Sequence, residues 1–114
     1  MIYTSGQIPY TTDGQRVNGS IREQTAACLR NLSEILAAAG SSLDRAVKVT
    51  VFLTSMADFA EMNEEYGQWF GGVEVGEDGE ETKRVSPARS CVAVKELPLG
   101  VPVEIECVAL GPGA

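Results

Sequence analysis

Histidine is absent from all 114 residues of the chain. This absence excludes Ser-His-Asp and Cys-His catalysis, and any metal site that needs a histidine ligand. Carboxylates, tyrosines, lysines, cysteines and ordered water remain as the groups that could transfer protons. Phosphate-binding loops are absent as well, since neither GxGxxG nor the P-loop pattern occurs. We therefore predict that the protein uses no metal and no cofactor.

Cysteine is scarce, because Cys28, Cys91 and Cys107 are the three in the chain and none forms a CxxC pair. This pattern favours neither a disulfide framework nor a zinc site, and free thiols are typical of a cytosol-like compartment. No apolar run approaches membrane-spanning length, and the N-terminus lacks a signal-peptide pattern. We expect a cytoplasmic protein that does not bind membranes, or a mitochondrial one if an N-terminal segment has been lost.

Positive charge is in the minority, with 9 Lys and Arg against 16 Asp and Glu, a net charge of −7 and an isoelectric point near 4.5. A surface this acidic disfavours nucleic acid as a partner, because it repels phosphate backbones. The composition is that of a globular protein, with 44% hydrophobic and 22% charged residues. The length predicts a single domain over residues 1–114.

Two helices are indicated by capping residues and apolar periodicity. Ser20 with Glu23 and Ser55 with Asp58 are capping boxes, in which side-chain oxygens satisfy amides that a helix start leaves free. Glycines mark both predicted ends: Gly40, Gly71 and Gly72. Apolar residues recur at helical spacing and predict buried faces: Ile21, Cys28, Leu29, Leu32, Ile35, Leu36 and Ala39, then Phe59, Met62, Tyr66, Trp69 and Phe70.

The remaining segments predict a sheet. Alternating or β-branched residues indicate strands at 1–9, 46–54, 88–95 and 102–110, with a tight turn at 11–14. The short link 96–101 predicts that the last two strands form a hairpin, and the polar segment 73–85 reads as a solvated loop. This order predicts an α+β fold, with both helices on one face of a mixed sheet.

The other face of this sheet also carries apolar side chains. Phe52 opposes Val51 along its strand, and Val108 and Leu110 oppose Ile105. Because two helices can cover only one face, these groups would be wet in an isolated chain. We expect other copies of the chain to cover them in a homo-oligomer.

Arg89 is the candidate for binding an anion. It lies in a strand of small and apolar residues directly after Pro87, and a guanidinium matches a carboxylate in two-point geometry. The alternative is an edge-strand arginine whose head reaches water. Cys91 shares its strand face, and a neighbouring arginine can favour a thiolate, although Cys91 and Cys107 also fit as small core residues.

Five other residues are candidates for a site. Glu104 and Glu106 lie two apart, so both point to one face of their strand, where they could hold water or could simply be exposed. Gly6, beside the Ser5 hydroxyl, would let a backbone approach a ligand, or would mark a bend. Asn63 lies beside Phe59 and Tyr66 on the second helix, where it could tie the helix to a loop.

Five segments of the chain together resemble the RidA (YjgF/YER/UK) family: SGQIP at 5–9, AAAGSSLDRAVKVTVFL at 37–53, DFAEMNEEYGQWF at 58–70, PARSCVAV at 87–94 and VPVEIECVAL at 101–110. The match covers nearly the whole chain, and PARSCV followed by VEIE is a highly specific combination. The resemblance implies a chorismate-mutase-like (bacillus type) α+β fold, assembled as a homotrimer. The sheets would pack into a central barrel, with active clefts between neighbouring subunits.

The resemblance also implies an activity, which is the hydrolysis of reactive enamine and imine intermediates such as 2-aminoacrylate to 2-oxo acids and ammonia. Arg89 would hold the substrate carboxylate, while Glu104 and the Cys91 carbonyl would position the attacking water. The remaining pocket residues would be Ser5, Gly6 and Asn63. An imine carbon is already electrophilic, so orientation of substrate and water suffices and the missing histidine is no obstacle.

Two features depart from the family pattern. Members usually carry one more strand before SGQIP, with a pocket tyrosine that neither Tyr3 nor Tyr10 matches, so the chain is either truncated or a natural short form. The acidic segment 73–85 looks expanded, close enough to Arg89 to alter access. The alternatives to a deaminase are a non-catalytic protein that binds small carboxylates or protein partners, and an endoribonuclease, which the negative charge and absent histidine disfavour.

Overall fold

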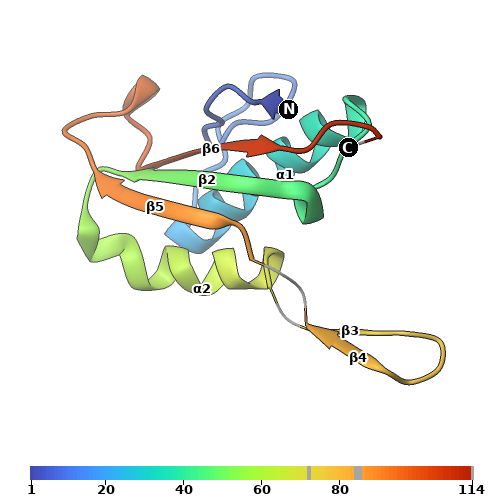
Figure 1. Cartoon of the computed structure of the whole chain (residues 1–114). Coiled ribbons are helices and arrows are strands. Elements are labelled where there is room, and N and C mark those ends of the chain that lie inside the picture. Colours follow the sequence, from blue (N-terminus) through green and yellow to red (C-terminus); the bar gives the residue numbers. More distant parts are fainter. Residues whose placement is uncertain (72, 84–85, 114) are drawn as a thin grey trace.

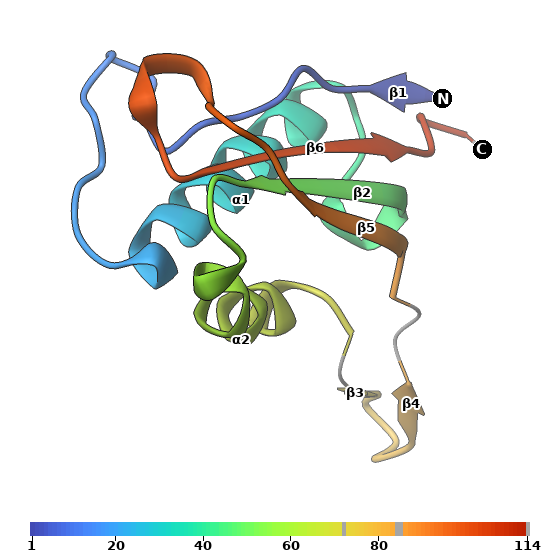
Figure 2. The ribbon, with the colours of Figure 1, turned by 90° about the vertical axis from the view of Figure 1, so that its left-hand side faces the viewer.

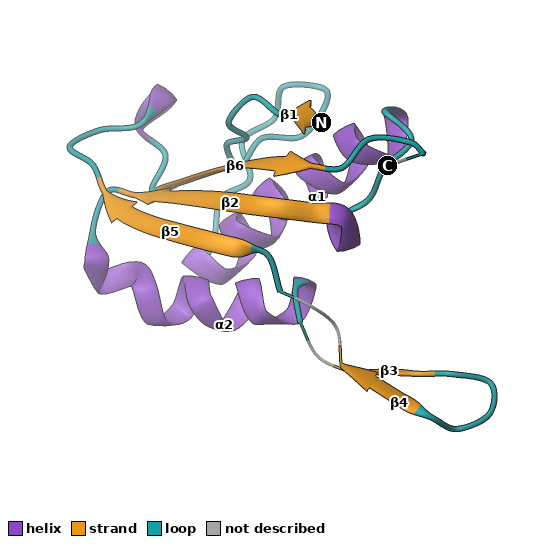
Figure 3. Cartoon of the chain, in the orientation of Figure 1, coloured by secondary structure: helices purple, strands orange, loops and turns teal. Residues whose placement is uncertain are grey.

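The computed structural model describes residues 1–71, 73–83 and 86–113. The chain forms a mixed sheet of four strands, two helices and a separate two-stranded hairpin. Figures 1 and 3 show how these elements are arranged, with the helices beside the sheet. The sheet has the order β1-β6-β2-β5, formed by β1 (Ile2–Tyr3), β6 (Val103–Ala109), β2 (Ala46–Leu53) and β5 (Ala88–Ala93). The helices are α1 (Ile21–Ala38) and α2 (Phe59–Trp69), and the hairpin pairs β3 (Val73–Val75) with β4 (Glu81–Lys83).

Helix α1 begins where the sequence predicts. The Ser20 hydroxyl accepts a hydrogen bond from the Glu23 amide at 3.1 Å, and Gly40 after the helix has a φ of 80°. Most of the predicted apolar face is buried: Ile21, Cys28, Leu29, Leu32 and Leu36. The prediction is wrong for Ile35 and Ala39, which are exposed, because they lie at the edge of the apolar stripe near the C-terminal end of α1.

Helix α2 begins three residues later than a capping box at Ser55 predicts. A 3₁₀ turn at Met56–Asp58 comes first, and the Ser55 hydroxyl accepts from the Ala57 amide. Asp58 caps nothing with its side chain, because the tighter turn changes the spacing that a capping box needs. Three residues of the predicted stripe are buried, and two are partly buried: Met62, Tyr66 and Phe70, then Phe59 and Trp69.

Strand β2 lies at the centre of the sheet and supplies its most buried side chains. Val49, Val51 and Leu53 are fully buried, as their alternation predicts. Val47 is 42% exposed, because a register shift between Ala46 and Lys48 moves it out of the alternation.

Strands β5 and β6 do not form the predicted hairpin, because β2 lies between them. Strand β5 runs parallel to β2, and β6 runs antiparallel to it. The link between them contains a 3₁₀ turn at Pro98–Gly100, and residues 94–102 are long enough to step across one intervening strand at about 4.8 Å per strand spacing. A short link therefore does not require pairing of the strands it joins.

Two other segments also differ from the predictions. The predicted loop at 73–85 contains the β3–β4 hairpin, whose turn is closed by a 2.9 Å bond from the Gly76 amide to the Glu80 carbonyl, and the hairpin projects away from the body (Figure 1). Within the predicted strand 1–9, only Ile2–Tyr3 is a strand, followed by an isolated bridge from Gln7 to Ile105. Residues 84–85, and the predicted helix end Gly72, lie outside the described residues.

Both helices pack on one face of the sheet, as predicted, and the core lies between these two layers (Figure 2). The opposite face, which we call the open face, carries the apolar residues expected there. Phe52, Val108 and Leu110 are half-buried, Val92 is 44% exposed and Tyr3 is 75% exposed. In the described part of the chain, no helix combines the length and the apolar character needed to cross a membrane.

Candidate functional site

Arg89 lies on β5 and points to the helix side of the sheet. It is aligned with Val49 of β2, which is fully buried among the core residues, so both side chains share the face that the helices cover. The strand is at the sheet edge, which leaves the long Arg89 side chain half-buried. The edge position thus combines a packed stem with an accessible guanidinium.

Three residues of α2 surround this guanidinium. Nη1 of Arg89 donates a 2.6 Å hydrogen bond to Oδ1 of Asn63. The guanidinium carbon lies 4.6 Å from the centre of the Tyr66 ring and 5.6 Å from that of Phe59. These residues are four and three positions apart, so all of them lie on one face of the helix. The contact between α2 and β5 is therefore built around one cation.

Among the described residues, no acidic side chain forms an ion pair with Arg89. The ion pair found there joins Arg22 to Glu64 instead. The aromatic rings and the Asn63 amide are neutral, so they attract the guanidinium without cancelling its charge. An unpaired, half-buried guanidinium is able to bind an anion, and its fork of donors fits a carboxylate.

Cys91 follows Arg89 on the same face of β5, as predicted, and aligns with buried Val51. Burial raises the pKa of its thiol above the ordinary 9.0, while the nearby Arg89 lowers it by less. Arg89 thus favours the Cys91 thiolate, as suggested, but loss of water outweighs this attraction and the pKa of the thiol is raised overall. Cys107 is also buried and its thiol pKa is raised by the same cause, as expected of a core residue.

Glu104 and Glu106 lie on the open face, the opposite side of the sheet from Arg89. They pair with Phe52 and Thr50 of β2, whose side chains alternate with the buried residues. Both glutamates share a face as predicted, with Glu104 half-buried and Glu106 exposed. Because the sheet separates them, Arg89 and Glu104 of one chain do not meet.

Gly6 fits closely against Glu104. A Cβ atom at position 6 would lie 2.8 Å from both Cδ and Oε2 of that glutamate, which is closer than carbon atoms normally approach. The absence of a side chain at Gly6 therefore lets the carboxylate lie where it does. Ser5 is exposed beside it, and its carbonyl accepts a 3.3 Å hydrogen bond from Nε2 of the Gln7 side chain.

The six site residues predicted from the sequence thus form two groups. We call Asn63, Arg89 and Cys91 the arginine half-site, which lies on the helix side of β5. We call Ser5, Gly6 and Glu104 the glutamate half-site, in which Gly6 lies against Glu104 of β6 on the open face and Ser5 precedes Gly6 in the chain. Sequence reasoning missed Phe59 and Tyr66 as neighbours of Arg89. The signal was present, since two aromatic residues seven apart flank Asn63 on one helix face.

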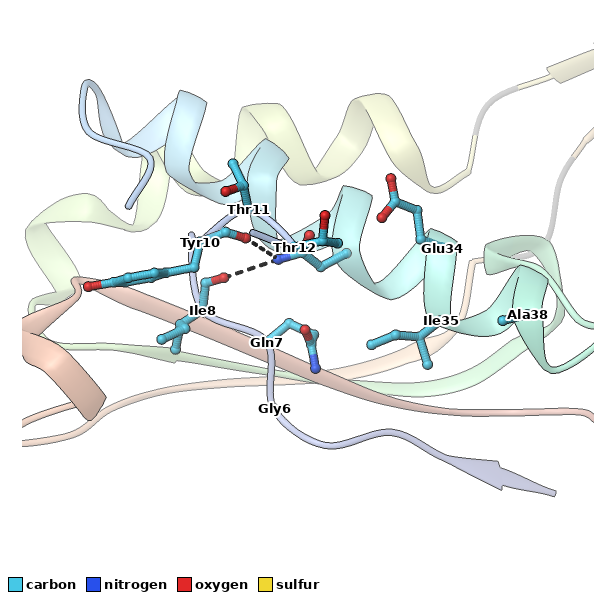
Figure 4. Close-up of a pocket in the computed structure, with 10 residues that line it drawn as sticks. Gly6, Gln7, Ile8, Tyr10, Thr11, Thr12, Glu34, Ile35 and Ala38 are labelled. Atoms are coloured by element: carbon cyan, nitrogen blue, oxygen red, sulfur yellow. Dashed lines mark hydrogen bonds between the residues drawn. The ribbon is translucent and has the colours of Figure 1, made fainter. Parts of the chain in front are cut away.

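A cavity of about 360 Å³ lies beside the glutamate half-site, between residues 6–12 and α1 (Figure 4). Its walls include Gly6, Ile8, Glu34 and Ile35, and the Asn31 amide donates to the Ile8 and Tyr10 carbonyls across it, at 3.3 and 2.8 Å. Of the predicted site residues, only Gly6 lines it. Within the described residues, no cluster of three or more acidic or cysteine side chains could hold a metal ion.

Comparison with known proteins decides the family. The model of the family described as endoribonuclease L-PSP matches residues 1–111. The chain belongs to this family, the RidA/YjgF family. It is 49% identical to the mitochondrial protein mmf1 of Schizosaccharomyces pombe, over 96% of this chain and 62% of that protein. It is 38% identical to TdcF of Escherichia coli K12, whose name provisionally describes a reactive intermediate deaminase, over 96% of this chain and 78% of that protein.

Solved structures of RidA/YjgF proteins share the fold. The structure of yeast Mmf1 matches with a TM-score of 0.81 and 45% identity, over 96% of this chain and 78% of that one. The structure of E. coli TdcF with bound serine matches with a TM-score of 0.80 and 37% identity, over 95% and 78%. The α+β fold with a mixed sheet and two helices is therefore that of this family.

Proposed function

We propose that this RidA/YjgF protein hydrolyses reactive enamine and imine intermediates of the 2-aminoacrylate type, giving 2-oxo acids and ammonia. The observation that carries the proposal is the Arg89 guanidinium, which is held by neutral groups and has no acidic partner among the described residues. Such a group suits the carboxylate of a small 2-imino acid. Family membership and the name of TdcF support the same reaction class.

The complete site would form between copies of the chain. Every copy carries both half-sites, but on opposite faces of its sheet. A cleft that contains both groups therefore needs Arg89 of one copy and Glu104 of another. The apolar open face, with Phe52, Val92 and Val108, gives such copies a surface to bury. We propose a homotrimer in which each cleft combines an arginine half-site with the glutamate half-site of a neighbour.

The proposed reaction needs no covalent enzyme intermediate. An enamine first tautomerises to the imine, and water then adds to the imine carbon while nitrogen takes up a proton. The resulting carbinolamine loses ammonia as its C–O bond becomes the carbonyl of the 2-oxo acid. Arg89 would hold the carboxylate, and Glu104 of a neighbouring copy with the Cys91 carbonyl would hold the water. Orientation of two reactants in this way is a large source of rate acceleration.

The test is ammonia release from 2-aminoacrylate that is generated during the assay. Arg89→Ala should abolish most of the turnover while the oligomer persists, because the charge that binds the carboxylate is removed. Arg30→Ala is the matched control, since Arg30 lies exposed on α1 and outside both half-sites. Wild-type turnover in Arg89→Ala, or an equal loss in Arg30→Ala, would contradict the role of Arg89.

A non-catalytic protein that binds small carboxylates in the same clefts is the second candidate. The structure of TdcF with bound serine favours it, since serine also presents a carboxylate. Calorimetry with 2-oxobutanoate, run beside the ammonia assay, separates the two functions: binding without turnover would support the second.

RNA cleavage, which the family description names, is disfavoured by the net charge of −7 and the missing histidine. Ribonuclease activity that vanishes in Arg89→Ala would reverse this order.

The cysteines and the relatives of the chain bear on its compartment. All three cysteines are free thiols, which suits the cytoplasm or another reducing compartment. Two relatives are named as mitochondrial proteins. We propose a cytoplasmic location, with the mitochondrial matrix as the alternative, and imaging of the tagged protein distinguishes them.

A further inference from the structure

We propose that Phe59 and Tyr66 are positioning residues, which hold the Arg89 guanidinium against their rings so that its remaining donors face an incoming carboxylate. This inference rests on the proposed function, because it concerns how the arginine half-site recognises its substrate. It assigns a task to two aromatic residues that the sequence pattern alone explains as core.

The geometry places the guanidinium against both rings. Phe59 and Tyr66 are seven positions apart on α2, about two turns of the helix. The guanidinium carbon lies 5.6 Å from the Phe59 ring centre and 4.6 Å from the Tyr66 ring centre, within the range of a cation–π contact for both. Asn63 is in the turn between both, where its Oδ1 accepts from Nη1. Three successive turns of one helix face thus contact one cation.

Aromatic rings suit this task because they attract a cation without using its hydrogen-bond donors. A guanidinium has five N–H donors, of which Asn63 takes one among the described residues, and the others can serve a carboxylate. An acidic residue in place of either ring would hold Arg89 as firmly, but would compete with the substrate for it. Neutral rings therefore restrain the side chain and preserve its charge.

Tyr66 contributes its ring rather than its hydroxyl. The residue is only 7% exposed, and its hydroxyl has no hydrogen-bond partner among the described residues. Burial raises the pKa of Tyr66 to about 12, although Arg89 lowers it, so the ring stays neutral at physiological pH. The Phe70 ring packs against it, with 4.6 Å between the two ring centres, and restrains it further.

The experiment compares variants that remove a ring with variants that keep one. Phe59→Leu and Tyr66→Leu should each raise the KM for ammonia release, and the Kd for 2-oxobutanoate, by about three- to tenfold, the scale of a lost cation–π contact. The turnover number kcat should change less than about twofold, because water is positioned by other groups. Tyr66→Phe keeps the ring and should match the wild type.

Trp69→Leu is the matched control. Trp69 is a partly buried aromatic residue on the same helix, and its indole donates to Glu65 rather than contacting Arg89. Its loss should leave KM and Kd unchanged. An equal rise in KM for Trp69→Leu and Phe59→Leu would overturn the inference, because helix stability would then explain both. Since Phe59 is only half-buried, Phe59→Leu decides the question if Tyr66→Leu does not fold.

A second readout does not depend on activity. The ¹⁵N order parameter of the Arg89 Nε–H group should fall in Phe59→Leu and Tyr66→Leu, and should stay at the wild-type value in Tyr66→Phe and Trp69→Leu. An unchanged order parameter in the first two variants would overturn the inference whatever the reaction. Wild-type turnover and 2-oxobutanoate binding in Arg89→Ala would instead overturn the proposed function. The two failures are therefore distinguishable.

Discussion

At the scale of single residues, Gly6 and Arg89 show how little freedom the two half-sites have. Gly6 makes room for the Glu104 carboxylate, which would otherwise contact a Cβ atom at 2.8 Å. Arg89 is restrained by one hydrogen bond and two rings. In both cases the reactive group is held by a neighbour that carries no charge of its own.

Gly6→Ala should reduce ammonia release by about tenfold to a hundredfold, because small displacements of a positioning group have effects of this size. The added methyl group would push against the far end of the Glu104 side chain, which can move, so the free energy of unfolding should change by less than about 1 kcal/mol. Activity assays and urea unfolding measure the two effects.

Gly67→Ala provides the control for this substitution. A Cβ atom at Gly67 would meet open space on α2, and alanine in a helix interior should add about 0.5–1 kcal/mol of stability. Its ammonia release should equal that of the wild type. Full activity of Gly6→Ala would show that the Glu104 carboxylate does not need its observed position.

At the scale of elements, local patterns predicted the helices well and the strand order poorly. Ser20 and the apolar spacing behind it fix the start and the buried face of α1 through neighbouring residues alone. The partners of β5 are decided by packing across the whole sheet, and nothing in residues 88–110 indicates that β2 lies between the last two strands. The contact of Arg89 with Asn63 is of the same kind, since it joins residues 26 positions apart.

The packing of α1 on the sheet predicts a loss of stability at alkaline pH. Cys28 is fully buried on α1, its thiol lies 3.9 Å from the Val103 carbonyl oxygen, and burial raises its pKa from 9.0 to about 12. The unfolded chain therefore loses this proton first, so the stabilising contribution is complete below pH 9 and is lost as the pH rises towards 12.

Urea unfolding between pH 8 and pH 11 tests this expectation. The free energy of unfolding should fall with pH in the wild type, and should fall less steeply in Cys28→Ala, which has no thiol to titrate there. Cys28→Ala will be less stable throughout because it leaves a cavity, so the slopes are compared rather than the absolute values. Parallel slopes above pH 9 would refute the contribution of Cys28.

At the scale of the whole molecule, the sheet both separates the half-sites and offers the surface that would reunite them. Arg89 faces the helices, while Glu104 shares the open face with Phe52 and Val92. Alternation along the strands predicted the open face for Phe52, but did not predict which face Arg89 takes. Sequence alone could not show that β2 lies between the strands of Arg89 and Glu104, because this depends on the strand order.

Val92→Glu should therefore break assembly and activity together. Val92 is 44% exposed on the edge strand β5, so the single chain tolerates a glutamate there, whereas a face buried between copies does not. We expect light scattering to give the mass of three chains for the wild type and 12.1 kDa for the variant. Ammonia release should be lost, because each separated chain keeps both half-sites on opposite sides of its sheet.

Val75→Glu is the control: at a 66% exposed position on the projecting hairpin, it should keep the trimer and its activity. A wild-type chain that is monomeric and fully active would contradict a site shared between copies.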